Sequence, residues 1–337
     1  MIGMSERAPG FKRILGIETS CDETAVSVIE NGTHIRSQLV YSQIKSHQAF
    51  GGVVPEVASR MHTEKIHSLI DTCLRESALS LAQIDAIAVT YGPGLEGALL
   101  VGLAAAKAMA AGANKPLIPV NHLEGHMYAH FLSDTPPEFP FICLLVSGGH
   151  TLLAQVNDHH DILQLGSTRD DAVGEAFDKV ARVLSLGYPG GPIVEKMAKT
   201  GNPKAFSFPR ALRQSPFEFS FSGLKTAVLQ QVNRLQEPLP IADLCASFQQ
   251  AVIDTLISKS FYACNHLSIP RLILSGGVAA NQSLVSQFKD QASKQDLQVY
   301  AVAPKLCTDN ASMIAARAYH VPPVDPSIIQ ATPQLSL

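Results

Sequence analysis

The sequence is poor in charge and lacks any extended run of basic residues. Charged side chains make up 16% of its 337 residues, the formal net charge is −3, and no more than two basic residues follow one another. A protein that binds nucleic acid on its own normally carries a basic stripe. Any contact with RNA is therefore expected to be local or shared with partner proteins.

Long apolar runs and paired cysteine motifs are missing as well. No eighteen apolar residues follow one another without interruption, so no membrane span is predicted. The polar N-terminus, with Pro9 and Gly10, lacks the apolar core of a signal peptide. The six cysteines form no C-x-x-C pair, which argues against a disulfide framework or a zinc knuckle. We therefore expect a cytoplasmic protein with reduced thiols and no membrane contact.

Two parts of the chain share one pattern. An apolar strand at residues 13–21 runs into small and acidic residues and precedes an alternating strand at 24–29, and residues 141–150 and 151–156 repeat this arrangement. Each pair is predicted to form a hairpin whose turn exposes backbone N–H groups and hydroxyls, which suit phosphate oxygens. Helical patterns between the hairpins predict mixed sheets covered by helices. The expected fold is a duplicated α/β domain with a cleft between the copies.

The segment 119–130 carries the most informative pair of residues. It places His122 and His126 four residues apart, just after an apolar run. On a helix this spacing puts both imidazoles on one face, where they can bind one metal ion, although twelve histidines make a chance pair easy to find. Asp309, before a small-residue helix, is either a third ligand or the N-cap of that helix. Two imidazoles and one carboxylate with open positions would suit Fe(II) or Zn(II).

The second half of the chain contains a nucleotide-like pattern. A buried strand at residues 271–275 is followed by two glycines and Asn281, a further glycine loop spans residues 187–192, and Asp178 lies on an expected helix. Together these features predict nucleotide binding. The alternatives are a helix cap for Asn281, simple turns for the glycines and a surface charge for Asp178.

Two other patterns are less specific. Residues 92–97 match G-x-G-x-x-G, but no acidic residue ends the following strand and Pro93 removes one N–H, so we expect a strand-to-helix turn rather than a dinucleotide site. Residues 196–225 mix lysines and arginines with five phenylalanines. Such a stretch either stacks RNA bases or is a solvated loop over a hydrophobic anchor.

The motifs in their order resemble one known family. They are GIETSCDET at 16–24, residues 50–60 with His62, HLEGH at 122–126, VSGGHT at 146–151, GYPGGP at 187–192, FSFSGLKT at 219–226, SGGVAAN at 275–281 and TDNA at 308–311. From about residue 14 to about residue 319 the chain resembles the TsaD family of bacterial tRNA adenosine threonylcarbamoyltransferases, once labelled glycoproteases or O-sialoglycoprotein endopeptidases.

The resemblance implies a fold and an activity. The fold is a duplicated actin/sugar-kinase/Hsp70-type (RNase H-like) domain. The activity is transfer of the threonylcarbamoyl group from threonylcarbamoyl-AMP to N6 of adenosine 37, 3′ of the anticodon, in tRNAs that read codons beginning with A. With a linker at residues 133–138, we expect an N-terminal extension at 1–12, a first domain at 13–135 closed by a helix at 309–320, a second, nucleotide-binding domain at 136–308, and a loose tail at 321–337.

The resemblance also implies site residues and partners. One divalent metal, most often iron, would be bound by His122, His126 and Asp309. The adenylate would be held by Leu145, Val146, Ser147, Gly148, Gly149, Asp178, Gly191, Glu195 and Asn281. The family acts with a catalytically idle TsaB-like paralogue, a TsaE-like ATPase and threonylcarbamoyl-AMP synthase.

The chain departs from the family pattern at two places. Glu195 stands where many members carry Asp, and the first twelve residues extend beyond the usual start, so that Met4 offers a second initiator.

The turn between the first two expected strands offers a proton acceptor for the adenine amine. Asp22 or Glu23 is our candidate, and a turn cap or a salt bridge is the alternative. A phosphotransferase of the same fold would not need His122 and His126. A metalloprotease would need a base beside the metal helix, and Glu124 occupies the wrong position for that role.

Overall fold

The computed structural model describes residues 10–212 and 214–337, which form two compact units. Of these described residues, unit 1 contains 10–47, 53–136 and 309–337, and unit 2 contains 48–52, 137–212 and 214–308. Residues 1–9 of the expected N-terminal extension lie outside the described part of the chain.

Unit 1 is built on a five-stranded mixed sheet with the order β3-β2-β1-β4-β5. Strands β1 to β3 are antiparallel neighbours, whereas β4 runs parallel to both β1 and β5, so the carboxyl ends of β1, β4 and β5 meet at one edge. Its elements are β1 (Arg13–Glu18), β2 (Glu23–Glu30), β3 (His34–Ser42), α1 (Ile44–Gln48), α2 (Pro55–Glu76), η1 (Leu81–Gln83), β4 (Ala86–Gly92), α3 (Glu96–Ala113), β5 (Leu117–Asn121), α4 (His122–Tyr128), η2 (Ala129–Leu132) and α11 (Ala311–Ala318).

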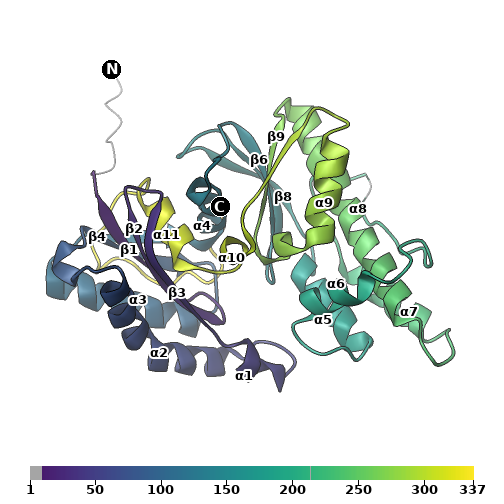
Figure 1. The fold of residues 1–337 in the computed structure, drawn as a ribbon, viewed down its shortest axis with the longest axis horizontal. Coiled ribbons are helices and arrows are strands. Elements are labelled where there is room, and N and C mark those ends of the chain that lie inside the picture. The colour runs from purple at the N-terminus through teal and green to yellow at the C-terminus, as the bar shows by residue number, and fades with distance from the viewer. Residues whose placement is uncertain (1–9, 213) are drawn as a thin grey trace. The chain divides into compact units, whose positions relative to one another are not determined.

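Helices cover both faces of this sheet. Helices α2 and α3 pack on one face, where alternate residues of β1, β2 and β4 form the core, and α11 packs on the other (Figure 1). The approach of α11 depends on Gly16 in β1, because a Cβ at that position would lie 2.4 Å from the carbonyl oxygen of Ala311. The C-terminal helix therefore belongs to the first unit.

Unit 2 repeats this plan. Its sheet has the order β10-β9-β6-β7-β8, with β6 to β8 antiparallel and β9 parallel to both β6 and β10. The predicted duplicated α/β fold, with an antiparallel hairpin opening each copy, is confirmed. Its elements are β6 (Phe141–Val146), β7 (Thr151–Val156), β8 (Ile162–Ser167), α5 (Val173–Val183), α6 (Gly190–Ala198), α7 (Ser222–Val232), α8 (Ile241–Leu267), β9 (Arg271–Ser275), η3 (Gly277–Ala280), α9 (Gln282–Ala292), β10 (Gln298–Ala301) and α10 (Pro304–Cys307).

The core of unit 2 is centred on α8, whose buried side chains lie all around the helix. Such a pattern is typical of a helix enclosed by its own domain. Helix α6 and the sheet pack against it, and Phe248 of α8 meets Phe177 of α5 edge-on with ring centroids 5.1 Å apart. The six cysteines of the chain are free, and five are buried.

The C-terminal segment from residue 321 does not match the expected loose tail. Val324 pairs with Leu117 beside β5, Thr332 donates its N–H to Tyr91, and Ile329 is buried in the core of unit 1. Gly92 makes room for it, since a Cβ there would lie 2.1 Å from the carbonyl oxygen of Thr332. The segment has no periodicity because backbone hydrogen bonds, rather than an amphipathic face, attach it.

Helix α3 is long and apolar enough to cross a membrane by length and composition alone. In unit 1 it packs against α2 and β4, and Leu103, Ala106 and Ala110 are buried there. This packing explains the apolar composition of α3 as that of a helix covering a sheet.

Candidate functional site

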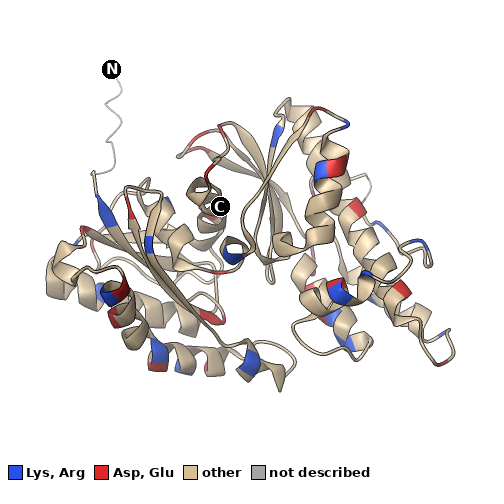
Figure 2. Cartoon of the chain, in the orientation of Figure 1, with Lys and Arg blue, Asp and Glu red and all other residues tan. Residues whose placement is uncertain are grey.

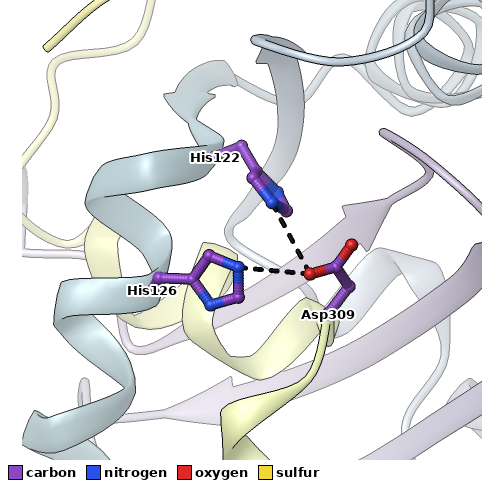
Figure 3. A group of neighbouring side chains, drawn as sticks. All are labelled: His122, His126 and Asp309. Atoms are coloured by element: carbon purple, nitrogen blue, oxygen red, sulfur yellow. Dashed lines mark ion pairs between the residues drawn. The ribbon is translucent and has the colours of Figure 1, made fainter. Parts of the chain in front are cut away.

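The two histidines of the candidate metal centre share one short helix. Helix α4 starts at His122 directly after β5, and the side chain of Asn121 caps it by accepting a hydrogen bond from Leu123 N at 2.9 Å. The cap turns the chain sharply from strand to helix. As a result both rings lie on one side of α4, with centroids 4.7 Å apart (Figure 3).

Asp309 faces both rings from the start of α11. Its Oδ1 lies 3.6 Å from Nε2 of His122 and 3.2 Å from Nε2 of His126. The N-cap of α11 is Asn310, whose Oδ1 accepts from Met313 N at 3.0 Å, so Asp309 does not take the capping role that was its alternative. The three ligand atoms all lie within 4.8 Å of one another.

Gly125 allows the two helices to approach so closely. A Cβ at this position would lie 2.7 Å from Cδ1 of Ile314 and 3.3 Å from Cγ of Met313. Helix α4 therefore packs on α11 through a glycine that lies between His122 and His126. This close approach places Asp309 within reach of the histidines.

The carboxylate of Glu18 supports the site by binding His122 on the side of the ring away from Asp309. It is completely buried and accepts hydrogen bonds from Ser20 N at 2.5 Å, Thr90 Oγ1 at 2.5 Å and His122 Nδ1 at 3.0 Å. Glu18, Thr90 and His122 meet because β1, β4 and β5 are parallel and end at one edge. Since the Nδ1–H of His122 is directed at Glu18, its Nε2 is left to face Asp309.

Charge in this buried site alters the pKa of His122. Burial alone would lower it, but the carboxylates of Glu18 and Asp309 outweigh burial and raise the pKa to about 9. A positive charge between these two carboxylates is therefore favoured. Glu18 was not predicted as a site residue, although an acidic residue at the end of an apolar strand was a usable signal.

The residues present fit a divalent metal. His126 is buried, and neither ring nitrogen makes a hydrogen bond within the described residues, although Nε2 faces Asp309. A buried imidazole without hydrogen bonds is costly unless it binds something. Two imidazoles and one carboxylate form a donor set that suits Fe(II) or Zn(II) and leaves positions open.

Two further carboxylates lie near this site. Asp22 and Glu23 form the turn from β1 into β2, and Glu23 accepts a hydrogen bond from Ser42 Oγ at 3.1 Å. Burial, followed by the negative charges of Asp22 and Asp309, raises the pKa of Glu23 well above its usual value. The turn can therefore hold a proton beside the candidate metal ligands.

His62 holds this turn in place from α2. Its Nε2–H donates to the carbonyl oxygen of Cys21 at 2.9 Å, and its Nδ1 accepts from Thr24 Oγ1 at 2.7 Å. Burial lowers the pKa of His62, which favours the neutral ring that this pattern requires. The residue was part of a motif in the sequence but had no assigned role.

Glu124 is occupied by an ion pair and is not available as the base of a protease. Its Oε2 accepts a hydrogen bond from Nε of the buried Arg317 at 2.7 Å, and Arg317 also donates to Tyr128 Oη at 3.1 Å. A carboxylate held in this way does not serve as the base of a metalloprotease.

In unit 2 several of the residues expected to bind the adenylate lie at or beyond the carboxyl ends of two parallel strands. Leu145 and Val146 end β6, the Ser147–Gly149 loop follows, and Asn281 follows β9. Ligands of open α/β sheets bind outside the carboxyl ends of parallel strands. A Cβ on Gly148 or Gly149 would meet nothing within 4 Å, so the backbone there is open to approach.

Three of the expected side chains are engaged within unit 2. Asp178 accepts from Gly190 N at 2.6 Å, and Glu195 accepts from Gln282 N at 2.8 Å. Asn281 caps α9 by accepting a hydrogen bond from Leu284 N at 2.9 Å, and this helix cap is the alternative role given above. Its side chain also donates to Gln249 Oε1 at 2.8 Å. Gly191, at the start of α6, is open. These contacts join α5, α6 and α9 around the ends of β6 and β9.

The aromatic residues of segment 196–225 belong to the core. Phe208, Phe219 and Phe221 are buried, and Phe206 and Phe217 are partly buried against the same cluster. In Figure 2, lysines and arginines are scattered among acidic residues along the elements of both units. The hydrophobic-anchor alternative therefore describes this segment better than base stacking by its phenylalanines.

A family model described as tRNA N6-adenosine threonylcarbamoyltransferase, TsaD, matches residues 34–316. The chain belongs to this family. A TsaD-family protein of that description from Dictyoglomus turgidum is 51% identical over 310 residues, with 91% of this chain and 92% of the relative covered. One from Symbiobacterium thermophilum is 53% identical over 311 residues, with 91% of each covered. The predicted resemblance is confirmed, and the TsaD-family chain is a transferase.

Solved structures support the fold alone. A full-length HypF has a TM-score of 0.62 at 11% identity, with 92% of this chain and 46% of that chain covered. Component A of (R)-2-hydroxyglutaryl-CoA dehydratase from Acidaminococcus fermentans has a TM-score of 0.54 at 15% identity, with 91% of this chain and 98% of that chain covered. The expected actin/sugar-kinase/Hsp70-type fold of this TsaD-family chain is confirmed.

Proposed function

We propose that the chain transfers the threonylcarbamoyl group of threonylcarbamoyl-AMP to N6 of adenosine 37 in tRNAs that read codons beginning with A. The observation that carries the proposal is the group of His122, His126 and Asp309 beside the Asp22–Glu23 turn, within a chain of this family. Neither a phosphotransferase nor a metalloprotease accounts for both features, because the former needs no histidine pair and the latter lacks a base.

One divalent metal per chain, Fe(II) in the first instance and Zn(II) as the alternative, would be held by His122, His126 and Asp309. When bound, it would supply Lewis-acid polarisation and a template for substrate oxygens. Glu18 would orient His122, and Gly125 would maintain the spacing of α4 and α11.

The residues of this chain would then perform binding and proton transfer. The N–H groups of the Ser147–Gly149 loop, with Leu145, Val146, Asp178, Gly191, Glu195 and Asn281 around it, would hold the adenylate. Adenine N6 forms a bond to the carbamoyl carbon, the bond from that carbon to the phosphate oxygen breaks, and AMP departs. The proton of N6 passes to the carboxylate of Asp22 or of Glu23, in the turn that His62 keeps in place.

The contribution of Asp22 can be measured directly. Removing a positioned proton acceptor typically costs ~10²–10⁴-fold in rate. We expect Asp22→Ala to lose single-turnover rate in that range while its affinity for the adenylate stays unchanged. An unchanged rate would remove Asp22 from the mechanism.

The partners follow from the low net charge and from the family. A chain with net charge −3 has little general affinity for RNA. We propose that it shares tRNA binding with a TsaB-like paralogue and a TsaE-like ATPase, receives its donor from threonylcarbamoyl-AMP synthase, and works in the cytoplasm.

The test of the function is single-turnover transfer of labelled threonine from synthetic threonylcarbamoyl-AMP to an unmodified tRNA transcript, with and without the two partners. His122→Ala is the variant, and His34→Ala, at an exposed position on β3, is the matched control. Label that enters tRNA with the control and not with His122→Ala supports the proposal. No label with any chain, despite adenylate binding, would point to a nucleotide-binding scaffold.

A further inference from the structure

Unit 2 contains a cavity that the proposed chemistry does not use. Its volume is about 610 Å³, and it lies between the second half of α8 and the segment that begins at Arg210. Its lining includes Arg210, Gln214, Asp254, Ser258, Lys259 and Tyr262. None of the residues proposed to bind the adenylate or the metal lines it.

The cavity wall carries a buried cation. Lys259 is 6% exposed, and its Nζ donates to the carbonyl oxygens of Leu212 at 2.9 Å and Ser215 at 2.6 Å. It forms no ion pair with any carboxylate in the described part of the chain. Burial lowers its pKa, and the more distant charge of Glu218 offsets this only in part. A buried charge without an opposite charge is costly, so an anion in the cavity would be favoured.

The second cation of the lining is partly balanced. Arg210 donates to Asp254 Oδ2 from Nε at 3.2 Å and from Nη2 at 2.5 Å, and it donates to Phe208 O from Nη1 at 2.6 Å. Two of its five N–H donors make no hydrogen bond within residues 10–212 and 214–337. The titratable lining thus has two cations against one carboxylate, an excess of positive charge in a chain that is negative as a whole.

An aromatic ring stands beside these cations. Tyr262 is 45% exposed and stacks on His266, with centroids 5.4 Å apart and planes inclined by 12°. Phe217 supports both rings from within, with its centroid 5.7 Å from that of Tyr262. Two neighbouring rings therefore support the Tyr262 ring while almost half of the side chain stays exposed, as a stacking platform requires.

We propose that this cavity and the Tyr262 ring bind a phosphate and its neighbouring base in the tRNA substrate. RNA is the partner that combines the negative charge favoured by Lys259 and Arg210 with a planar base for Tyr262. The inference rests on the tRNA substrate of the proposed function and assigns a contact area to it. Arg210, within residues 196–225, contributes one cation, and α8 contributes the other, Lys259, together with the ring of Tyr262.

The test is tRNA affinity, measured by fluorescence anisotropy at two salt concentrations, for a matched pair of variants. Gln214→Glu adds one negative charge in the cavity, and Gln230→Glu makes the same change on the exposed face of α7, outside it. Both are isosteric and exposed, so folding is preserved. We expect Gln214→Glu to bind about fivefold more weakly, with a shallower salt dependence, and Gln230→Glu to bind like the wild type.

The ring is tested separately. Tyr262→Ala is expected to weaken tRNA binding about 5- to 100-fold, whereas Tyr262→Phe keeps the stacking surface and binds like the wild type. Equal affinity for the wild type and all variants, including no binding by any of them, overturns the inference. So does binding of AMP or inorganic phosphate in the cavity that tRNA does not displace. Normal threonylcarbamoyl transfer with unaffected tRNA binding in Gln214→Glu would overturn the contact alone and leave the proposed function intact.

Discussion

Nδ1 of His122 donates a hydrogen bond to the buried carboxylate of Glu18 at 3.0 Å. Through Thr90 Oγ1 and Ser20 N, the same carboxylate joins the ends of β1 and β4 to the candidate metal ligand that follows β5. The orientation of His122 is thus set by the sheet itself rather than by the short helix α4. Such outer hydrogen bonds fix the tautomer of a ligand and increase its basicity.

Replacing this carboxylate should weaken metal binding. We expect Glu18→Gln to lower Fe(II) or Zn(II) affinity about 10- to 100-fold, because an amide neither carries charge nor accepts all three hydrogen bonds. Competition with a chelator measures the affinity. Glu30→Gln, which removes a surface partner of Arg13 on the same hairpin, is the control and should bind metal normally. Equal affinities in the two variants would contradict a role for Glu18.

The glycine between the histidines offers a second test. Gly125→Ala should push α4 away from α11, abolish metal binding and cost about 1–3 kcal/mol of stability through overpacking. Gly112→Ala in α3 is the matched control, because its Cβ meets nothing within 4 Å, and it should be neutral or stabilising by up to about 1 kcal/mol. Denaturant unfolding and metal content measure both effects. Metal bound at full stoichiometry by Gly125→Ala would refute the argument.

The buried His62 predicts a pH dependence. Burial lowers its pKa in the folded state below the ordinary value of 6.5, so protonation favours the unfolded chain. Its stabilising contribution is complete above pH 6.5 and is lost as the pH falls through that value toward the folded pKa. We expect the stability difference between the metal-free wild type and His62→Gln to shrink between pH 7.5 and pH 5.5 in urea unfolding. A difference that stays constant would show that His62 does not titrate on unfolding.

Glu23 is expected to destabilise the protein at neutral pH while supporting the reaction. Its raised folded pKa means that the protonated form is favoured, so the stability linked to it is complete below pH 4.5 and lost as the pH rises through the folded value. At pH 7.5 Glu23→Gln should therefore be more stable than the metal-free wild type, and its threonylcarbamoyl transfer should be slower. Thermal unfolding at pH 4.5 and 7.5 measures the gain, which should be larger at pH 7.5. A loss of stability at pH 7.5 would show that the carboxylate is needed for folding.

Much of the architecture was predictable from local pattern. The two hairpins follow from the apolar strands at 13–21 and 141–150 and the second strands at 24–29 and 151–156, because strand patterns are a short-range property. The i, i+4 spacing of His122 and His126 likewise placed two rings on one helical face. The attachment of the tail from residue 321 was not predictable, since isolated backbone hydrogen bonds and the space above Gly92 leave no periodic signal.

The sequence by itself determined the duplicated α/β plan, the family and the types of residue available for chemistry, because periodicity and motifs depend on neighbours in the chain. Only the tertiary structure decided that Asp309 faces the histidines while Asn310 caps α11, that Glu18 supports His122, and that the phenylalanines of residues 196–225 are core. These choices depend on contacts between segments as far apart as β1, β5 and α11, where parallel strand ends and close helix packing bring the side chains together.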